Sequence, residues 1–391
     1  MPWRHTSPLD QKTPFIAAYL RDRLAMTELC ELYRVSRKTG YKWVARDLTH
    51  GPQGLEERSR RPSASPRHTP DYVVAAILEA RQRPPSWGAK QRVSFLRTRH
   101  PRWPWPARST VCDILRRHGL VPKQRQRRAI GHPGKPISHM GAPHDVWSAD
   151  FKGHFKTGDG RYGYPLTITD GYSRVLLSCQ ALSSTSVAEA KPVFTRVFKE
   201  FGLPQRIRTD NGVPFATNTL GRLSQLSAWW VRLGLLPAFI EPGTPQQNGR
   251  HERMHRTLKA ETTRPPGATL RAQQRKFNHF REEFNHERPH EALDMCTPAA
   301  CYDTSSRKMP TQLPPLEYPD RFEVRYVSAN GGIRWHHHWV NVSHVCVGEY
   351  VGLEAIADGV WNVDFGPLKR GRLLERHMRI EDAYGRLKRH R

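Results

Sequence analysis

Three acidic residues in the middle of the chain have neighbours that make a carboxylate unexpected. Asp150 lies in an apolar, strand-like stretch, Asp210 ends a second such stretch, and Glu252 lies among arginines. Carboxylate oxygens are the ligands that Mg²⁺ and Mn²⁺ prefer. Two such ions about 3.5 to 4 Å apart can activate a water or a 3′-hydroxyl on one side of a phosphodiester and stabilise the leaving oxygen on the other, without a protein nucleophile. Taken singly, each acid is more typical of a surface ion pair, so the prediction of a metal-binding catalytic triad depends on all three and on their flanking residues.

The residues around these acids predict the elements that must position them. Alternation with a period of two predicts consecutive antiparallel strands in VWSADFKGHF, YPLTITD and RVLLSCQAL, and two further strands in QRIRTDNG and PAFIEPG. Helices are expected over 187–201, over LGRLSQLSAWWVRLGL and over QNGRHERMHRTLKAE. We therefore expect an α/β core with a mixed five-stranded sheet. Asp150 would lie in its first strand, Asp210 at the end of its fourth, and Glu252 on its last helix.

The last of these helices has two distinct faces. At about 100° per residue, Glu252, Arg256 and Lys259 fall on one face, whereas Met254, Thr257 and Leu258 fall on the opposite one. We expect the apolar face to pack and the charged face to meet the site. An ordinary amphipathic surface helix would explain the stripe, but not an acid among arginines.

The composition favours a nucleic-acid partner. Lys and Arg total 63 against 36 Asp and Glu, a formal net charge of +27, which predicts a polyanion such as double-stranded DNA. The 37 aromatic residues (11 Trp, 14 Phe and 12 Tyr) are too many for a disordered basic protein. No apolar run is long enough to cross a bilayer, and six cysteines without a CxxC pair favour a reducing compartment. We expect a cytoplasmic protein without a membrane partner.

The N-terminal residues predict a helix-turn-helix. A short helix over Met26–Tyr33 is followed by Ser36, which is expected to cap a second, basic helix. The residues of that second helix expected to contact DNA are Arg37, Lys38, Thr39, Tyr41 and Lys42. A helical hairpin with a merely solvated basic face is the alternative.

A second helical unit is expected over 70–121. Val73 and Ile77 belong to one helical stripe, and STVCDILRRHGL begins with a Ser-Thr cap. The linker before this unit contains Arg58, Arg60 and Arg61 among Pro and Ser. Such a composition is typical of an extended arm in a DNA minor groove, and equally of a flexible spacer.

The residues that flank the acids resemble a known family. WSAD, TDNGVPF and PGTPQQNGRHERMHRTLK resemble, in the right order, the catalytic-core motifs of retroviral-integrase-like DDE transposases. YRVSRKTGYKW and GLEERSRRP resemble the DNA-binding region of bacterial insertion-sequence transposases, so the resemblance covers most of 27–300. It implies a ribonuclease H-like core in which Asp150, Asp210 and Glu252 hold two Mg²⁺ or Mn²⁺ ions. It also implies that Arg256 and Lys259 hold terminal phosphates of the DNA end.

The chain departs from the family pattern in one spacing. The stretch between Asp210 and Glu252 is longer than usual, and the usual spacing would select Gln246, which is not a carboxylate. The motif frame therefore selects Glu252, and Glu241 is the alternative acid. Gln247 and Asn248, just before the helix, carry amides that can donate to and accept from base edges.

Towards the C-terminus, RFEVRYV, WVNVSHV, EYVGLEAIA and VWNVDF alternate with a period of two, which predicts a small β-barrel. The expected architecture is multidomain, with all-α helix-turn-helix units, the α/β core and this barrel. The expected domains are a helix-turn-helix domain over 1–55, a basic linker over 56–69, a second helix-turn-helix domain over 70–121, a basic linker over 122–143, the integrase-like core over 144–303, a linker over 304–316, a DNA-binding β-barrel over 317–378 and a basic tail over 379–391.

These features together predict a nucleoid-associated bacterial DNA transposase. It would bind the ends of an insertion sequence, nick their 3′ ends by metal-dependent hydrolysis and join the 3′-hydroxyl to target DNA, as a homo-oligomer in a synaptic complex. The alternatives are a DNA-binding regulator with an inactive core and a nuclease of the same fold that does not join strands.

Overall fold

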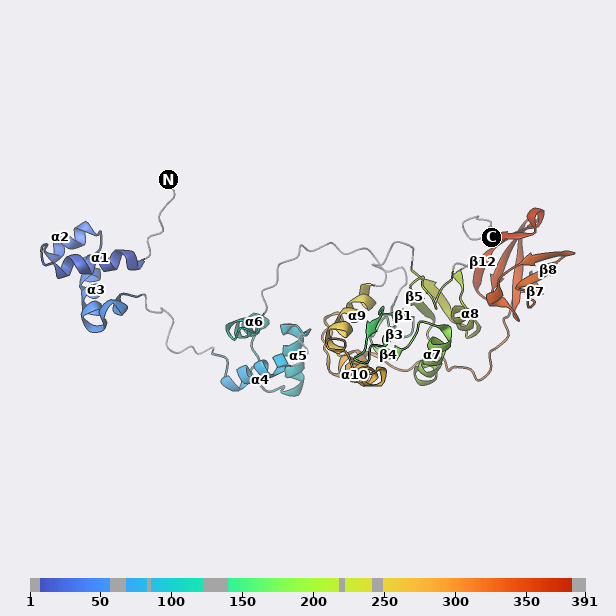
Figure 1. Ribbon diagram of the computed structural model, residues 1–391, viewed down its shortest axis with the longest axis horizontal. Coiled ribbons are helices and arrows are strands. Elements are labelled where there is room, and N and C mark those ends of the chain that lie inside the picture. The colour runs from blue at the N-terminus through green and yellow to red at the C-terminus, as the bar shows by residue number, and fades with distance from the viewer. Residues whose placement is uncertain are drawn as a thin grey trace. The chain divides into compact units, whose positions relative to one another are not determined.

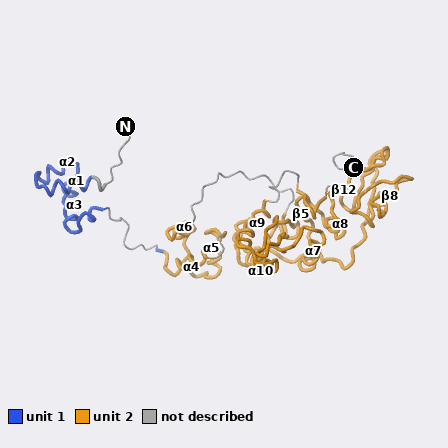
Figure 2. Tube along the Cα trace, in the orientation of Figure 1, with its two compact units in different colours: residues 1–68 blue, residues 69–391 orange. Residues whose placement is uncertain are grey.

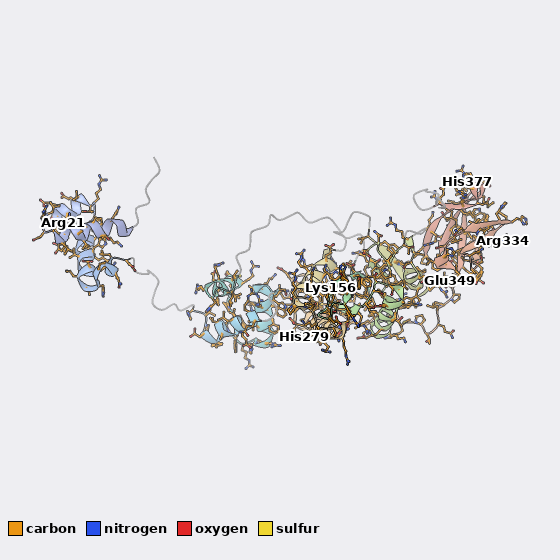
Figure 3. All side chains as sticks on the ribbon, in the orientation of Figure 1. Arg21, Lys156, His279, Arg334, Glu349 and His377 are labelled. Atoms are coloured by element: carbon orange, nitrogen blue, oxygen red, sulfur yellow. The ribbon has the colours of Figure 1, made fainter. Side chains whose placement is uncertain are left out.

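The computed structural model describes residues 8–56, 68–82, 86–121, 140–217, 222–240 and 249–381 (Figure 1). The chain divides into two compact units, residues 1–68 and residues 69–391 (Figure 2). Basic side chains occur in both units, as Arg21 in the first and Lys156 and Arg334 in the second illustrate (Figure 3). Within the described ranges, no helix is both long and apolar enough to cross a membrane.

The first unit is a three-helix fold with a small apolar core. Its helices are α1 (Pro8–Leu20), α2 (Met26–Leu32) and α3 (Arg37–His50), followed by a 3₁₀ turn, Gly51–Leu55. Phe15, fully buried, packs edge-on against Tyr33 and Trp43. A Cβ at Gly40 would lie 2.7 Å from Cys30 Sγ, so a glycine is needed where α3 crosses α2. The predicted cap is confirmed, because Ser36 Oγ accepts from Thr39 N at 3.2 Å.

Three further helices form a second apolar cluster, around Val73, Ile77 and Trp87. They are α4 (Asp71–Gln82), α5 (Ala89–Arg99) and α6 (Arg108–Arg117). The predicted Ser-Thr cap is wrong: α6 begins one residue before Ser109, and its N-cap is Ala107, without a capping side chain. Because Ala107 already has an extended backbone, the helix can begin before the hydroxyl residues.

Residues 144–303 contain a mixed sheet, as predicted. Its strands are β1 (Val146–Phe151), β2 (Phe155–Lys156), β3 (Tyr162–Asp170), β4 (Leu176–Leu182), β5 (Arg206–Thr209) and β6 (Leu236–Phe239). The order is β2-β3-β1-β5-β6, and β4 also pairs with β3. The pairings of β1 with β3 and of β3 with β4 are antiparallel, whereas those of β1 with β5 and of β5 with β6 are parallel. The predicted count of five strands is corrected to six, because VWSADFKGHF divides into β1 and the short β2 instead of forming one strand.

Helices cover both faces of this sheet. They are α7 (Val187–Phe201), α8 (Gln225–Arg232), α9 (Gly249–Thr262) and α10 (Leu270–Glu282), with a π-helical turn at Glu283–Glu287 and 3₁₀ turns at Glu291–Leu293 and Pro298–Cys301. One apolar cluster joins α7 and α8 to Trp147 and Ala149 of β1 and Ile168 of β3. A second joins Met254 of α9 and Phe277 of α10 to β4. The two clusters therefore lie on opposite faces of the sheet.

The predicted linker over 304–316 has neither helix nor strand, yet it packs on the core. Arg307 O accepts from Leu203 N at 2.7 Å, and Arg307 Nη1 donates to Pro204 O at 2.7 Å. The buried Ser305 donates to Leu203 O at 2.8 Å. This segment is thus held along the loop between α7 and β5.

The C-terminal residues form β structure. The strands are β7 (Phe322–Tyr326), β8 (Gly332–Trp335), β9 (His338–Asn341), β10 (Tyr350–Ala357), β11 (Val360–Phe365), β12 (Leu368–Leu374) and β13 (Arg379–Glu381), with 3₁₀ turns at His344–Cys346 and Glu375–His377. The sheet order is β13-β12-β11-β10-β7, and β8 and β9 pair separately. The predicted closed barrel is not confirmed. Among the described strands, the five-stranded sheet stays open because its edge strands, β13 and β7, do not pair with each other.

Candidate active site

Asp150 is directed by the alternation of β1. Trp147 and Ala149 point into the apolar cluster under α7 and α8, so the intervening Ser148 and the following Asp150 point to the other face of the sheet. Asp150 pairs with Thr167 of β3, and Thr167 likewise lies between two residues of that cluster, Leu166 and Ile168. Asp150 and Thr167 therefore share the face that α9 covers.

Asp210 follows β5, which runs parallel to β1. Val146 is level with Arg206, and Ser148 is level with Arg208. Continuing this register two residues further places Asp150 level with Asp210, at the same end of adjacent strands. Gly212 N donates to Asp210 Oδ1 at 3.1 Å, which holds the carboxylate at the turn after the strand.

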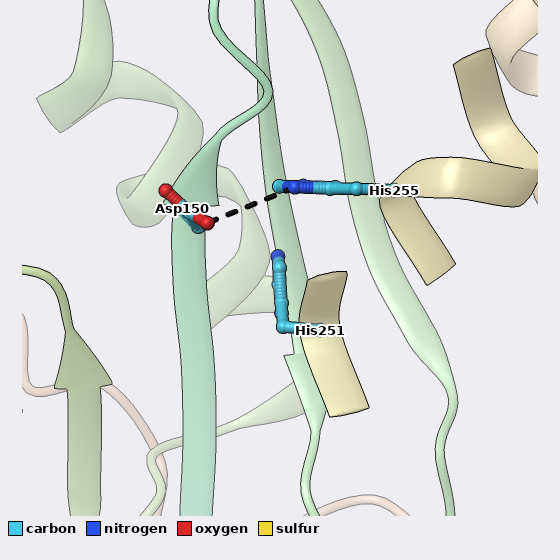
Figure 4. Close-up of side chains that lie close together, drawn as sticks. All are labelled: Asp150, His251 and His255. Atoms are coloured by element: carbon cyan, nitrogen blue, oxygen red, sulfur yellow. Dashed lines mark ion pairs between the residues drawn. The ribbon is translucent and has the colours of Figure 1, made fainter. Parts of the chain in front are cut away.

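Glu252 lies in the first turn of α9, next to a buried stripe. The buried side chains are His251, Met254, His255 and Leu258, at the helical spacing of three and four. Met254 and Leu258 pack as predicted, whereas Thr257, expected on the same face, is only half-buried. Glu252 is exposed at the edge of the stripe. Figure 4 shows His251 and His255 projecting from α9 towards Asp150 on β1.

A hydroxyl connects the two histidines to the sheet. Thr167 Oγ1 lies 2.7 Å from His251 Nε2 and 2.6 Å from His255 Nε2, and it donates to the carbonyl oxygen of Asp150 at 3.1 Å. Thr169 Oγ1 lies 3.0 Å from His251 Nδ1. These bonds fix α9 on β3, and with it the position of Glu252.

The three predicted acids interact electrostatically. Burial, then the charge of Asp210 and, more weakly, that of Glu252 raise the pKa of Asp150 to about 7. Asp210 and Glu252 therefore each act on the Asp150 carboxylate. Carboxylates are the donors expected for a hard divalent cation.

The histidines are neutral. Burial lowers the pKa of His251 to about 3. Burial, then the neighbouring His251 and Lys152, lower the pKa of His255 far below its ordinary value. His255 Nδ1 lies 3.7 Å from Asp150 Oδ2, and with a neutral ring this contact is not a salt bridge (Figure 4). Asp150, His251 and His255 offer ligand atoms that all lie within 4.8 Å of one another, a grouping that could hold a metal ion.

Three arginines that the sequence did not single out lie near one another in the core. Burial lowers the pKa of Arg174 to about 10, and the positive charge of Arg250 contributes to that shift. Burial and Arg250 also lower the pKa of Arg208. Guanidinium groups that repel each other are stabilised by a polyanion such as a nucleic-acid backbone.

The other predicted residues have different environments. In α3, Arg37, Lys38, Tyr41 and Lys42 are exposed and Thr39 is half-buried, while Arg256 and Lys259 are exposed on α9. Five predicted DNA contacts and the alternative acid lie outside the described residues: Arg58, Arg60, Arg61, Gln247, Asn248 and Glu241. The sequence prediction missed His251, His255 and Thr167. Extending the Met254–Leu258 stripe by the helical spacing of three would have included both histidines, since His251 lies three residues before Met254 and His255 three residues before Leu258.

Family models match both the core and the N-terminal region. Residues 141–245 and residues 233–298 match two models that are each described as an integrase core domain. Residues 39–115 match a model described as a homeodomain-like domain.

The similar curated proteins include two from bacterial insertion elements. The chain is 24% identical over 256 residues to the insertion element IS407 uncharacterized 31.7 kDa protein of Burkholderia multivorans, a match that covers 63% of this chain and 86% of that protein. It is 24% identical over 249 residues to the insertion element IS476 uncharacterized 39.2 kDa protein of Xanthomonas euvesicatoria, covering 63% of this chain and 69% of that protein. Among solved structures, the HTLV-2 integrase catalytic core domain in complex with magnesium is 16% identical, with a TM-score of 0.34, covering 42% of this chain and all (100%) of that chain.

Proposed function

We propose that this protein is a DNA transposase. The chain is related to insertion-sequence transposases of the integrase-like superfamily, which supports the proposal. It binds the ends of an insertion sequence, nicks them at their 3′ ends by metal-dependent hydrolysis and joins the resulting 3′-hydroxyl to target DNA. The observation that supports this proposal is that the charges of Asp210 and Glu252 both act on Asp150. Asp150 lies near the end of β1, Asp210 directly follows the adjacent parallel strand β5, and Glu252 lies in the first turn of α9.

Asp150, Asp210 and Glu252 would hold two divalent ions, Mg²⁺ or Mn²⁺. Such ions would supply activation of the attacking water or 3′-hydroxyl and stabilisation of the leaving oxygen of the phosphodiester. The protein supplies the positions of the three carboxylates. The register of β1 and β5 sets the two aspartates, and the Thr167 bonds to α9 set the glutamate.

The basic residues bind the DNA. Arg256 and Lys259, exposed on the helix that carries Glu252, hold phosphates of the DNA end. Arg37, Lys38, Thr39, Tyr41 and Lys42 contact the recognition site. The predicted division of the chain is kept in this proposal: specificity lies in 1–121 and chemistry in 144–303, and the protein acts as a homo-oligomer.

One assay tests the proposal against its alternatives. The purified chain is incubated with end-bearing DNA, a target plasmid and Mg²⁺ or Mn²⁺, and the products are separated by size. A transposase yields 3′ nicks at the ends and joined products, a nuclease yields nicks without joining, and a regulator binds without cutting.

The matched control is Asp150→Asn, which removes one carboxylate but no surface contact with DNA. It should bind the ends and yield neither product. Binding without cleavage by the unmodified protein would contradict the proposal, as would cleavage that persists in Asp150→Asn.

A further inference from the structure

We propose that His255 Nδ1 is a nitrogen ligand of the ion that Asp150 holds, which makes this half of the site a mixed nitrogen and oxygen site. The inference deepens the proposed function and rests on it. It assigns to His255 a role that the three-carboxylate model leaves out.

The hydrogen bonds around Thr167 determine which histidine nitrogen is available. A threonine hydroxyl has one proton and two lone pairs. Thr167 gives its proton to the carbonyl oxygen of Asp150, so its lone pairs accept from the Nε2 atoms of His251 and His255. Both neutral rings therefore carry their proton on Nε2 and a lone pair on Nδ1.

The two Nδ1 lone pairs have different partners. The lone pair of His251 accepts from Thr169 Oγ1 at 3.0 Å, so this histidine is fully engaged in holding α9 on the sheet. The lone pair of His255 faces Asp150 Oδ2 at 3.7 Å. These two potential ligand atoms face each other where the His255 side chain is only 2% exposed.

A shared cation accounts for this arrangement. Ligand atoms that each lie about 2.0 to 2.2 Å from one ion are separated by about 3 to 4 Å, which matches the distance between His255 Nδ1 and Asp150 Oδ2. The Thr167 bond to Nε2 orients the ring and fixes the tautomer, as partners of metal-binding histidines do. Imidazole suits transition metals better than Mg²⁺, so the site should prefer Mn²⁺ to Mg²⁺.

Electron spin-echo spectroscopy of Mn²⁺ bound to the full-length chain tests the inference without an activity measurement. A directly bound imidazole gives a ¹⁴N modulation, which should change to a ¹⁵N doublet when only the histidines carry ¹⁵N. Wild-type protein that binds Mn²⁺ without this coupling would overturn the inference while leaving the proposed function intact.

Matched variants identify the histidine. His255→Asn should lose the coupling and bind Mn²⁺ at least about tenfold more weakly, whereas His251→Asn, on the same helix and equally buried, should keep the coupling. Coupling that persists in His255→Asn and disappears in His251→Asn would overturn the inference. Asp150→Asn tests the underlying function separately, because Mn²⁺ binding and strand transfer that both survive this change would contradict the carboxylate site itself.

Discussion

Two helices in different units both present basic side chains, but they differ in what holds them. In α3, Arg37, Lys38 and Lys42 are exposed, and the buried residues are Gly40 and Val44, of which Val44 belongs to the apolar cluster of this unit. In α9, Arg256 and Lys259 are exposed, but the buried stripe includes His251 and His255, both hydrogen-bonded to the sheet.

This difference reflects two tasks. Apolar packing is non-directional and can hold a helix that binds a flexible phosphate backbone. A helix that places a carboxylate beside two others requires directional bonds, because misplacement by about 1 Å can cost catalysis about 10²-fold. Under the proposed function, α3 is a binding helix and α9 is a helix that also serves chemistry.

The largest expected effect concerns the exposed basic side chains that both helices share, and it is a change in DNA affinity with salt. If about 6 to 10 phosphates are neutralised, affinity for DNA should fall roughly 10³- to 10⁵-fold between about 50 and 200 mM salt. Replacing Lys38 and Lys42 by Gln, or Arg256 and Lys259 by Gln, should each reduce the slope of log affinity against log salt by about two. Fluorescence anisotropy measures the slopes. A flat titration of the unmodified protein would exclude an extended DNA path.

The second effect distinguishes the role of α9 in strand joining from the role of α3 in DNA binding. Glu252→Gln on α9 should slow joining at least about 10³-fold, equivalent to about 4 kcal/mol of barrier, and leave DNA binding nearly unchanged. Lys38→Gln with Lys42→Gln on α3 should weaken binding but keep the joining rate on saturating DNA within a few-fold. Single-turnover assays measure both. Joining near the wild-type rate in Glu252→Gln would transfer the metal-binding role to Glu241.

The third effect tests the bonds that hold α9. Thr167→Val leaves the Nε2 protons of both histidines without their acceptor, at a cost of about 2 to 4 kcal/mol of unfolding free energy. Thr257→Val, on the less buried side of the same helix, should stay within about 0.5 kcal/mol. Urea denaturation followed by tryptophan fluorescence gives the two values. Equal stability of the two variants would mean that the hydroxyl bridge does not hold the helix.

The fourth effect is acid sensitivity. Because the folded-state pKa of His251 lies near 3, below its ordinary value, its contribution to stability is present above about pH 6.5 and is lost as the pH falls, by about 2 kcal/mol at about pH 5. Asp150, whose folded-state pKa is raised to about 7, acts oppositely: its stabilisation is lost as the pH rises from about 4 to 7. The Asp150→Asn variant removes this opposing contribution. In this variant, the backbone amides of α9 should lose protection from hydrogen exchange between about pH 7 and 5, after correction for the intrinsic exchange rate. Protection of α9 that does not change with pH would contradict the buried neutral histidine.

The smallest effect belongs to α3. Ser36→Ala removes the oxygen that accepts from Thr39 N, at a cost of about 1 kcal/mol, and should weaken DNA binding a few-fold. Ser36→Asn keeps a capping group and serves as the control. Thermal melting of the two variants tests the difference, and identical melting curves would show that the cap contributes little.

The sequence alone determined the elements that carry the three acids. The structure finds Asp150 in β1, Asp210 directly after β5 and Glu252 on α9, because the periods of two and of three to four residues are local properties of the chain. The sequence also predicted the cap at Ser36 and the burial of Met254 and Leu258. The catalytic role of the three acids stays a prediction.

Only the tertiary structure decided what surrounds these elements. Histidines in a basic helix are typical of a surface, and the burial of His251 and His255 depends on Thr167, a residue far away in the sequence that offers their Nε2 atoms a partner. Whether the C-terminal sheet closes likewise depends on pairing between β7 and β13, strands from distant parts of that segment. Burial of a polar group requires a partner from elsewhere in the chain, and sequence periodicity does not identify that partner.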